Sequence, residues 1–302
     1  MIIVPVLVRN EANRNLDLFL KTTSIFADKI IILDDCSDDN TIDICKEYKK
    51  VEIFESPFSI PMFSIDESKL RSHLWDRVRL IAKEGDWIFS LDADEIVSKN
   101  FINLKDKIIE DCNKNKYDWI TFHLCDMWNE KQYRVDGYWS PLFRRFFRFK
   151  DLEYGKNAKL HVGSLPKYAD ESKNGTSYSN VKIKHLSYIK DEDKEKKYNF
   201  YIKNTFGFNF LHALTIKDKN PRLVEYCDTY ESYNKEPNVL ICSLIKNREW
   251  CLNNFIDGIK KIEYDLKKIS FLFILNNSID NSKEILKQFK KEMENKCKNF
   301  KI

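Results

Sequence analysis

The chain has 302 residues, of which 43% are hydrophobic, 14% aromatic and 32% charged, and this composition is typical of a globular protein rather than a disordered one. Its 51 basic and 47 acidic residues nearly balance, so the net charge of +4 does not indicate a nucleic-acid partner. No apolar run approaches the roughly 20 residues of a membrane helix, and the first residues lack the pattern of a secretory signal. The eight cysteines form no CxxC pair, so we expect neither a zinc site nor a disulfide framework, but reduced thiols in a cytoplasmic protein.

The first hundred residues alternate between strand and helix patterns. Apolar runs predict strands at residues 2–8, 29–34, 51–56 and 87–92. Apolar side chains at helical spacing predict helices beginning near Leu16 and over residues 68–83, and a third helix should begin near Thr41 with Asp38 or Asp39 as its N-cap. This order favours an α/β fold with a mixed, mainly parallel sheet flanked by helices.

From residue 117 onward the pattern loosens into strand-like pieces rich in aromatic residues. WITFHLCDMW, YWSPLFRRFFRF and LHVGSLPKY are expected to be strands joined by turns that build an acceptor-binding wall. In RRFFRF the near period of two predicts one buried aromatic face and one basic face, in preference to a nucleic-acid surface. Residues 182–201 should begin as a strand and become a charged helix, whose lysines at 190–197 are expected to form a solvated face.

The stretch FSLDADEIV places Asp92 and Asp94 two residues apart at the predicted end of a strand. Side chains at i and i+2 of an extended chain point to the same face, where like charges repel unless a cation joins them. Mg²⁺ and Mn²⁺ prefer oxygen ligands, and one or two carboxylates suffice because these ions often retain waters. The spacing therefore predicts a divalent metal site at this edge.

A nucleoside-diphosphate sugar is a ligand that needs such a cation, because breaking its anomeric carbon–oxygen bond leaves additional negative charge on the diphosphate. Asp35, at the end of a neighbouring strand, is placed to accept from the imide N–H of a pyrimidine base. Glu11 and the backbone near Val8 would flank the base or ribose, and Arg77 or Arg79 could reach a phosphate.

The ordered set VPVLVRNE, IIILDDCSDDNT and GDWIFSLDADE resembles the family 2 glycosyltransferases over roughly the first hundred residues. The resemblance implies a GT-A fold, a nucleotide-sugar donor and an Asp-x-Asp motif for Mn²⁺ or Mg²⁺. It also implies that Asp35 contacts the base, that Asp92 lies near the ribose and the metal, and that Asp94 is the principal metal ligand. His185, in IKHLSY, resembles the late histidine that some GT-A enzymes add to the metal shell. Cys36, where the family has a small residue, is a departure, as is the acidic pair that follows it.

The expected reaction transfers a sugar from a nucleoside-diphosphate donor to a hydroxyl of a glycan, lipid or protein, and a UDP-sugar is the preferred donor. We expect inversion, with a retaining outcome left open. Asp94 and Glu95 are the candidate catalytic residues, but no spacing selects the general base, and the other candidates in the acceptor half are Asp126, Asp136, Glu153 and Asp170. His161 is a weaker candidate for touching substrate.

Two alternatives belong to other classes of protein. In a haloacid-dehalogenase-type phosphatase, Asp92 would be the nucleophile and Asp94 the acid and base, but that motif should open the fold, whereas here it follows three strands. The other alternative is a catalytically degenerate scaffold that binds nucleotide-sugars.

The last part of the chain resembles its beginning. The apolar run at residues 239–245 leads to the polar residues 246–249, as residues 6–8 lead to residues 9–11. FLFILNNSIDNSKEIL follows IIILDDCSDDNTIDIC, with Asn276 and Asn277 taken as the counterparts of Asp34 and Asp35. We therefore expect a GT-A domain over residues 1–235, with a nucleotide-sugar half at 1–100 and an acceptor half with a helical extension at 101–235. Residues 236–302 should form an incomplete second GT-A-like unit, as in a truncated tandem protein.

Overall fold

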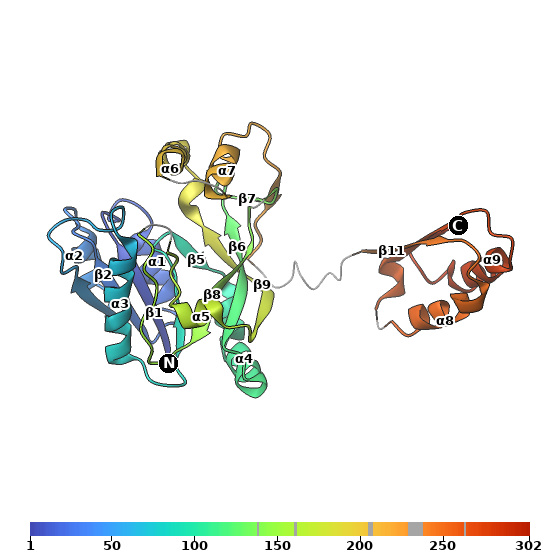
Figure 1. Ribbon diagram of the computed structural model, residues 1–302, viewed down its shortest axis with the longest axis horizontal. Helices are drawn as coiled ribbons and strands as arrows, with labels where there is room; N and C mark the ends of the chain where they lie inside the picture. The colour runs from blue at the N-terminus through green and yellow to red at the C-terminus, as the bar shows by residue number, and fades with distance from the viewer. Residues whose placement is uncertain (138, 160–161, 205–207, 229–237, 263) are drawn as a thin grey trace. The chain divides into compact units, whose positions relative to one another are not determined.

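The computed structural model describes residues 1–137, 139–159, 162–204, 208–228, 238–262 and 264–302 (Figure 1). These residues form two compact units, Met1–Tyr230 and Glu231–Ile302, which we describe separately. The boundary predicted after residue 235 falls within residues 229–237, outside the described part, so it stays a prediction.

Unit 1 is built on one mixed sheet of eight strands in the order β3-β2-β1-β4-β8-β6-β9-β5. The sheet continues from the residues of the 1–100 segment into those of the 101–235 segment. Its strands are β1 (Ile2–Val8), β2 (Lys29–Asp34), β3 (Val51–Glu55), β4 (Trp87–Phe89), β5 (Glu95–Val97), β6 (Trp119–Asp126), β8 (Leu142–Arg148) and β9 (Gly175–His185).

The pairing determines which residues meet at one edge of this sheet. Strands β1, β2, β3 and β4 are parallel, β8 is antiparallel to both β4 and β6, and β9 is parallel to β6. Strands β6 and β9 therefore run in the same direction as β1. Their carboxyl ends consequently share one edge with the ends of β1, β2 and β4, and this is where open α/β sheets bind ligands.

Helices cover both faces of the sheet. Apolar side chains of α1 (Leu16–Thr23), α2 (Thr41–Lys46) and α4 (Lys99–Asn115) pack on one face, in a core that includes Phe89 and Phe122. Those of α3 (Glu67–Ile81) and α5 (Lys167–Glu171) pack on the other face. The predicted α/β class, with a mixed sheet between helices, is confirmed.

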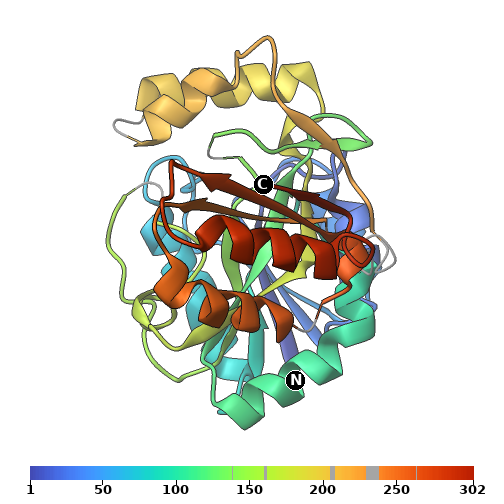
Figure 2. The same ribbon diagram turned by 90° about the vertical axis from the view of Figure 1, so that its right-hand side faces the viewer.

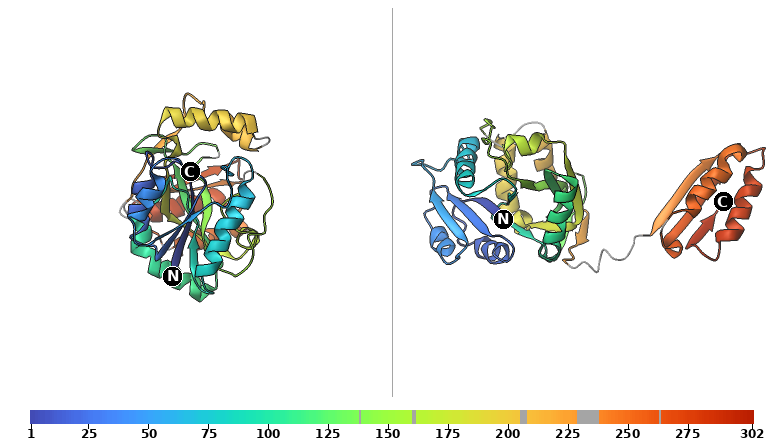
Figure 3. Two further views of the ribbon diagram at one scale, coloured as in Figure 1. Left: turned by 90° about the vertical axis from the view of Figure 1, so that its left-hand side faces the viewer. Right: turned by 90° about the horizontal axis from the view of Figure 1, so that it is seen from below.

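A smaller layer lies across the carboxyl edge. It contains the antiparallel pair β7 (Gln132–Arg134) and β10 (Leu223–Glu225), the short 3-10 helix η1 (Leu186–Tyr188), and the helices α6 (Asp191–Asn204) and α7 (Phe208–Thr215). In the left view of Figure 3, the chain begins at the bottom of the sheet and α6 lies across its top. Figure 2 gives the same placement of α6 and α7.

Several local predictions are wrong. Strand β4 ends at Phe89 instead of Asp92, and LHVGSLPKY contains no strand among its described residues but leads into α5. The run RRFFRF does not alternate between one aromatic and one basic face, because Phe146 and Phe147 are buried in the cores on opposite faces of a sheet covered on both sides. The N-cap of α2 is Asn40, although Asp39 does accept a hydrogen bond from the Thr41 N–H at 2.9 Å.

Unit 2 contains a parallel sheet in the order β11-β12-β13, formed by β11 (Val239–Ile245), β12 (Ile269–Leu275) and β13 (Asn299–Lys301). Helices α8 (Glu249–Lys260) and α9 (Ser282–Met293) pack on it through an apolar core, and the 3-10 helix η3 (Leu266–Lys268) precedes β12.

The loops at the strand ends of unit 2 have the geometry of those in unit 1. Asn10 and Asn247 have φ of 52° and 50°, and their N–H groups donate to Ser37 Oγ and Ser278 Oγ at 2.9 and 3.1 Å. The N–H of Asp35 donates to the Val8 carbonyl, and the N–H of Asn276 donates to the Ile245 carbonyl, both at 2.9 Å.

These hydrogen bonds correct the alignment expected from the sequence by one residue. Asn276 is the counterpart of Asp35 rather than of Asp34. Asn277, with φ of 46°, is the counterpart of Cys36, whose φ is 60°.

Candidate functional site

Three of the polar groups at the carboxyl edge form a chain of contacts. His185 ends β9 and Asp126 ends β6, and the two residues are partners in the strand register. The Nδ1 of His185 lies 2.7 Å from Asp126 Oδ1, and its Nε2 lies 3.6 Å from Asp94 Oδ2. Because Asp126 accepts the Nδ1–H, Nε2 is the ring nitrogen that faces Asp94.

Burial and nearby charges oppose each other in this chain. Burial raises the pKa of Asp94, but the charges of His185 and Lys197 and a hydrogen bond from Ser187 outweigh it and bring the pKa to about 2. Burial and Lys197 lower the pKa of His185, yet the facing carboxylates raise it overall. Asp94 is thus an ionised carboxylate at neutral pH.

Asp92 and Asp94 do not lie on an extended strand, as the spacing argument assumed. The strand has ended, and residues 92–95 form a turn closed by a 2.9 Å hydrogen bond from the Glu95 N–H to the Asp92 carbonyl. Asp92 instead lies between two buried guanidinium groups, with Arg71 and Arg145 each 3.6 Å from its carboxylate. The two aspartates therefore meet different partners.

Glu95 opens β5, and its side chain is only 1% exposed. It forms an ion pair with Arg145 and accepts the Asp92 N–H at 3.1 Å. Burial raises the pKa of Glu95 to about 7. These contacts give Glu95 a place in holding the turn, whereas a general base needs access to the acceptor.

Glu11 lies in the loop after β1, close enough to Asp94 for the two charges to interact. One of its oxygens pairs with Arg14 at 2.7 Å, while the other, Oε2, is buried without a hydrogen-bond partner. Burial raises the pKa of Glu11 to about 7. A buried acceptor without a partner at the carboxyl edge is a candidate for contacting a ligand hydroxyl. Val8, predicted to flank the base through its backbone, uses its carbonyl to accept the Asp35 N–H.

Asp35 directly follows β2 and is 1% exposed. Its carboxylate accepts the N–H groups of Met62, at 2.8 and 3.0 Å from its two oxygens, and of Phe63 at 2.9 Å. It therefore anchors the loop between β3 and α3. A base that bonded to Asp35 would have to share or replace these donors.

The structure does not bring Arg77 and Arg79 to this edge. Arg79 pairs with Asp151 at 2.7 Å, and Arg77 packs on the Phe54 ring and contacts His73. A helix that follows a parallel strand starts at the carboxyl edge and moves away by about 1.5 Å per residue, so its second half is remote. Arg71, in the first half of α3, is the arginine that reaches Asp92, and helix direction is the signal that could have identified it.

Most of the other candidate bases are engaged within the fold. Asp126 bonds to His185, Asp136 pairs with Arg134, and Asp170 pairs with Lys156 at 2.9 Å. Glu153 lies in an exposed loop beside α3. No contact selects one of these carboxylates, so the general base stays unassigned. His161, a candidate for touching substrate, is outside the described residues.

Asp94 and His185 fit a divalent cation. Their facing atoms, Oδ2 and Nε2, are both lone-pair donors when the imidazole is neutral, and Asp126 supplies the carboxylate that commonly orients a ligating histidine. Among the described residues, no three His, Cys, Asp or Glu side chains are already grouped as metal ligands. A site of this kind therefore needs oxygens from a substrate or water, as Mg²⁺ and Mn²⁺ sites at phosphates commonly do.

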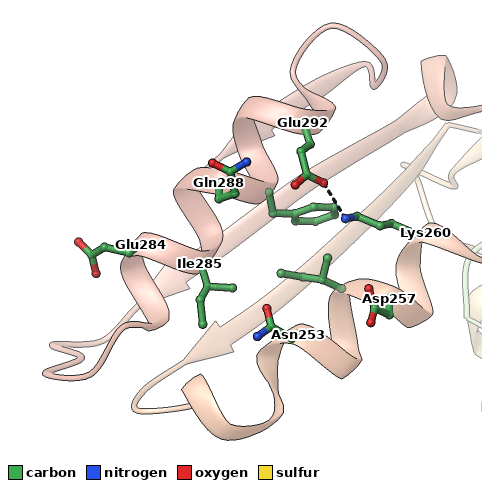
Figure 4. Close-up of a pocket in the computed structure, with 9 residues that line it drawn as sticks. Asn253, Asp257, Lys260, Glu284, Ile285, Gln288 and Glu292 are labelled. Atoms are coloured by element: carbon green, nitrogen blue, oxygen red, sulfur yellow. Dashed lines mark ion pairs between the residues drawn. The ribbon is translucent and has the colours of Figure 1, made fainter.

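Unit 2 has a groove between α8 and α9 (Figure 4). Its floor includes Ile256, Ile285 and Phe289, and an ion pair between Lys260 and Glu292 at 2.6 Å spans it. It lies on the helical layer instead of at the strand ends.

No protein-family model matches the sequence, and the comparison with curated proteins found no match. Among solved structures, the chain is similar to residues 1–349 of TarS from S. aureus at 17% identity, covering 71% of this chain and 68% of that one, with a TM-score of 0.43. The same TarS fragment in complex with UDP-GlcNAc matches at 15% identity over 71% and 70%, with a TM-score of 0.44. Glucosyl-3-phosphoglycerate synthase from Mycobacterium tuberculosis, in complex with Mn²⁺, UDP and glucosyl-3-phosphoglycerate, matches at 14% identity over 41% and 44%, with a TM-score of 0.28. At these scores the argument for function rests on the site itself.

Proposed function

We propose that unit 1 is a metal-dependent GT-A glycosyltransferase that transfers a sugar from a nucleoside-diphosphate donor to an acceptor hydroxyl. The observation that carries the proposal is the convergence of Asp94, His185 and Asp126 from three separate segments at the carboxyl edge, beside a second group of Asp92, Arg71 and Arg145. The resemblance of the first three motifs to family 2 glycosyltransferases supports the same reading.

In this proposal Asp94 and His185 hold Mn²⁺ or Mg²⁺, with Asp92 nearby and Asp126 orienting the imidazole. The bound ion would stabilise the negative charge that develops on the diphosphate leaving group. The acceptor oxygen forms a bond to the anomeric carbon as the bond to the diphosphate oxygen breaks, and the acceptor proton passes to a base. We propose inversion, UDP as the leaving group, and a glycan, lipid or protein acceptor.

The donor's base and ribose would lie against the loops after β1 and β2, near Val8, Glu11 and Asp35. Eight free cysteines, all within the described residues, support a reducing compartment, so a cytoplasmic location is part of the proposal. None of the described helices has the length and apolar character needed to cross a membrane. Unit 2 is proposed to be an incomplete second GT-A-like unit.

The test is a thermal-shift panel of UDP, GDP, CDP and TDP, with and without Mn²⁺, on the wild type and on Asp94→Asn. A ligand at about a hundred times its dissociation constant stabilises the folded state by roughly 2.7 kcal/mol, which is readily measured. We expect one nucleotide to give a shift that requires both Mn²⁺ and Asp94, and Asp94→Asn to abolish turnover while the protein stays folded. Near wild-type turnover by Asp94→Asn would refute the metal assignment, and no shift with any nucleotide would refute the donor class.

A further inference from the structure

Lysine 197 differs from its neighbours on α6. Lys194 and Lys196 each have an acidic partner one turn earlier, Asp191 at 2.9 Å and Asp193 at 3.9 Å. The Lys197 Nζ instead lies 4.7 Å from the centroid of the Tyr188 ring. The sequence predicted that this lysine belongs to a solvated face, but in the structure its side chain is half-buried and its ammonium lies over the Tyr188 ring.

Aromatic packing holds the Tyr188 ring, over which Lys197 lies, in place. Tyr188 is 3% exposed and stacks on Trp128, with centroids 6.0 Å apart, while Trp139 meets it edge-on at 4.8 Å. The Tyr188 ring also meets the His185 ring edge-on at 5.4 Å. Lys197 is therefore held one aromatic ring away from the histidine that faces Asp94.

The arginines near Asp92 and Asp94 already have carboxylate partners. Arg14 pairs with Glu11, Arg71 with Glu67 at 2.7 Å, and Arg145 with Glu95. No carboxylate of the described residues forms an ion pair with Lys197. Its charge nevertheless acts on Asp94, Asp126 and His185, lowering the pKa that each would otherwise have.

A diphosphate at this edge needs such a group. Asp92, Asp94 and Asp126 are all acidic, and a di-anion approaching them is repelled unless cations compensate. An ammonium held over the Tyr188 ring, which itself contacts His185, has hydrogen-bond donors not committed to a carboxylate and is suited to phosphate oxygens.

We propose that Lys197 binds the diphosphate of the nucleotide donor beside Asp94, so that α6 supplies part of the donor site. This inference rests on the proposed function. In this proposal the smaller layer across the carboxyl edge contacts the donor directly, in addition to any part that it has in binding the acceptor.

The test measures binding of UDP and of uridine, in the presence of Mn²⁺, to the full chain. The variants are Lys197→Met, which keeps the apolar stem over Tyr188, Lys197→Arg, which keeps the charge, and Lys196→Met as the matched control on the exposed side of the same helix. Calorimetry suits UDP, and ligand-observed NMR suits weakly bound uridine. Thermal unfolding verifies that each variant is folded.

We expect Lys197→Met to weaken UDP binding about tenfold or more, which corresponds to the loss of one charge-assisted hydrogen bond. Uridine binding should be unchanged, Lys197→Arg should recover most of the UDP affinity, and Lys196→Met should bind both ligands like the wild type. Unchanged UDP binding by Lys197→Met would overturn the proposal, and so would an equal loss of UDP and uridine, which indicates a structural role. If the wild type binds none of UDP, GDP, CDP and TDP, the proposed function itself is wrong and this proposal falls with it.

Discussion

The buried ion pair between Arg145 and Glu95 gives a quantitative prediction about what holds the site together. The side chains are 8% and 1% exposed, and they come from β8 and β5, which are separated in the sheet by β6 and β9. Replacing Arg145 by Met leaves the Glu95 carboxylate buried without its cation. Removing one partner of a buried pair in this way costs about 3–5 kcal/mol, a large part of a typical stability of about 5–15 kcal/mol.

A second substitution separates the lost pair from the stranded charge. In Arg145→Met/Glu95→Gln the buried Glu95 charge is removed as well. We therefore expect the free energy of unfolding of the double variant to exceed that of Arg145→Met by at least about 2 kcal/mol. The measurement belongs near pH 8.5, because burial raises the pKa of Glu95 to about 7 in the wild type, where the carboxylate is then ionised. In Arg145→Met the missing cation raises this pKa further, so the buried group is destabilising at pH 8.5 either as an unpaired charge or through the uptake of a proton.

Urea unfolding followed by tryptophan emission reports on unit 1. Of the six tryptophans, Trp250 is the one in unit 2, and it is already 79% exposed, so its emission should change little. The other five lie in unit 1 at positions 75, 87, 119, 128 and 139.

Two results would refute the reasoning. One is an Arg145→Met variant within about 1 kcal/mol of the wild type, and the other is a double variant no more stable than Arg145→Met. Glu95→Gln also decides between roles for Glu95, because a folded variant that loses turnover at saturating donor and acceptor would make it catalytic instead of structural.

Two further variants test the loops at the carboxyl edge. Glu11→Gln should be about as stable as the wild type at pH 5 but more stable at pH 8.5, by up to about 3 kcal/mol. The reason is that the pKa of Glu11 is about 7 in the folded state and 4.5 in the unfolded state, so the wild type loses stability as the pH rises between these values. A variant with the same melting temperature as the wild type at pH 5 and again at pH 8.5 would contradict a buried Glu11. Asp35→Ala should destabilise unit 1 by about 1–3 kcal/mol in urea, since the N–H groups of Met62 and Phe63 lose their acceptor, and should weaken nucleotide binding and relax base preference; unchanged stability would show that the loop does not depend on this carboxylate.

The sequence predicted the strands of the first half and the edge where their polar residues gather, because apolar runs and chain order determine both. It could not predict the partners of those residues. Asp126 meets His185 only because β6 and β9 pair in parallel, a contact across 59 residues that leaves no local signal. The same holds for Arg145 and Glu95, which are 50 residues apart.

The Asp-x-Asp spacing shows where periodicity misleads. An i, i+2 pair shares a face only while the chain stays extended, and here β4 ends three residues before Asp92. The turn that follows sends Asp92 toward two arginines and Asp94 toward His185. Each carboxylate thereby gains its own cationic neighbours, so the pair avoids mutual repulsion without requiring one shared ion.

Comparing unit 2 with unit 1 shows which residues of the shared motif determine the loop conformation and which are candidates for chemistry. Its strand-end loops keep the left-handed asparagine, the serine hydroxyl and the aspartate that accept or direct backbone hydrogen bonds in unit 1. At the position of Asp35, however, it has Asn276, an amide that carries no charge and cannot accept with both of its polar atoms. Most of the motif IIILDDCSDDNT therefore encodes a turn, and residues such as Asp35 and Asp94 must be tested individually before a function is assigned.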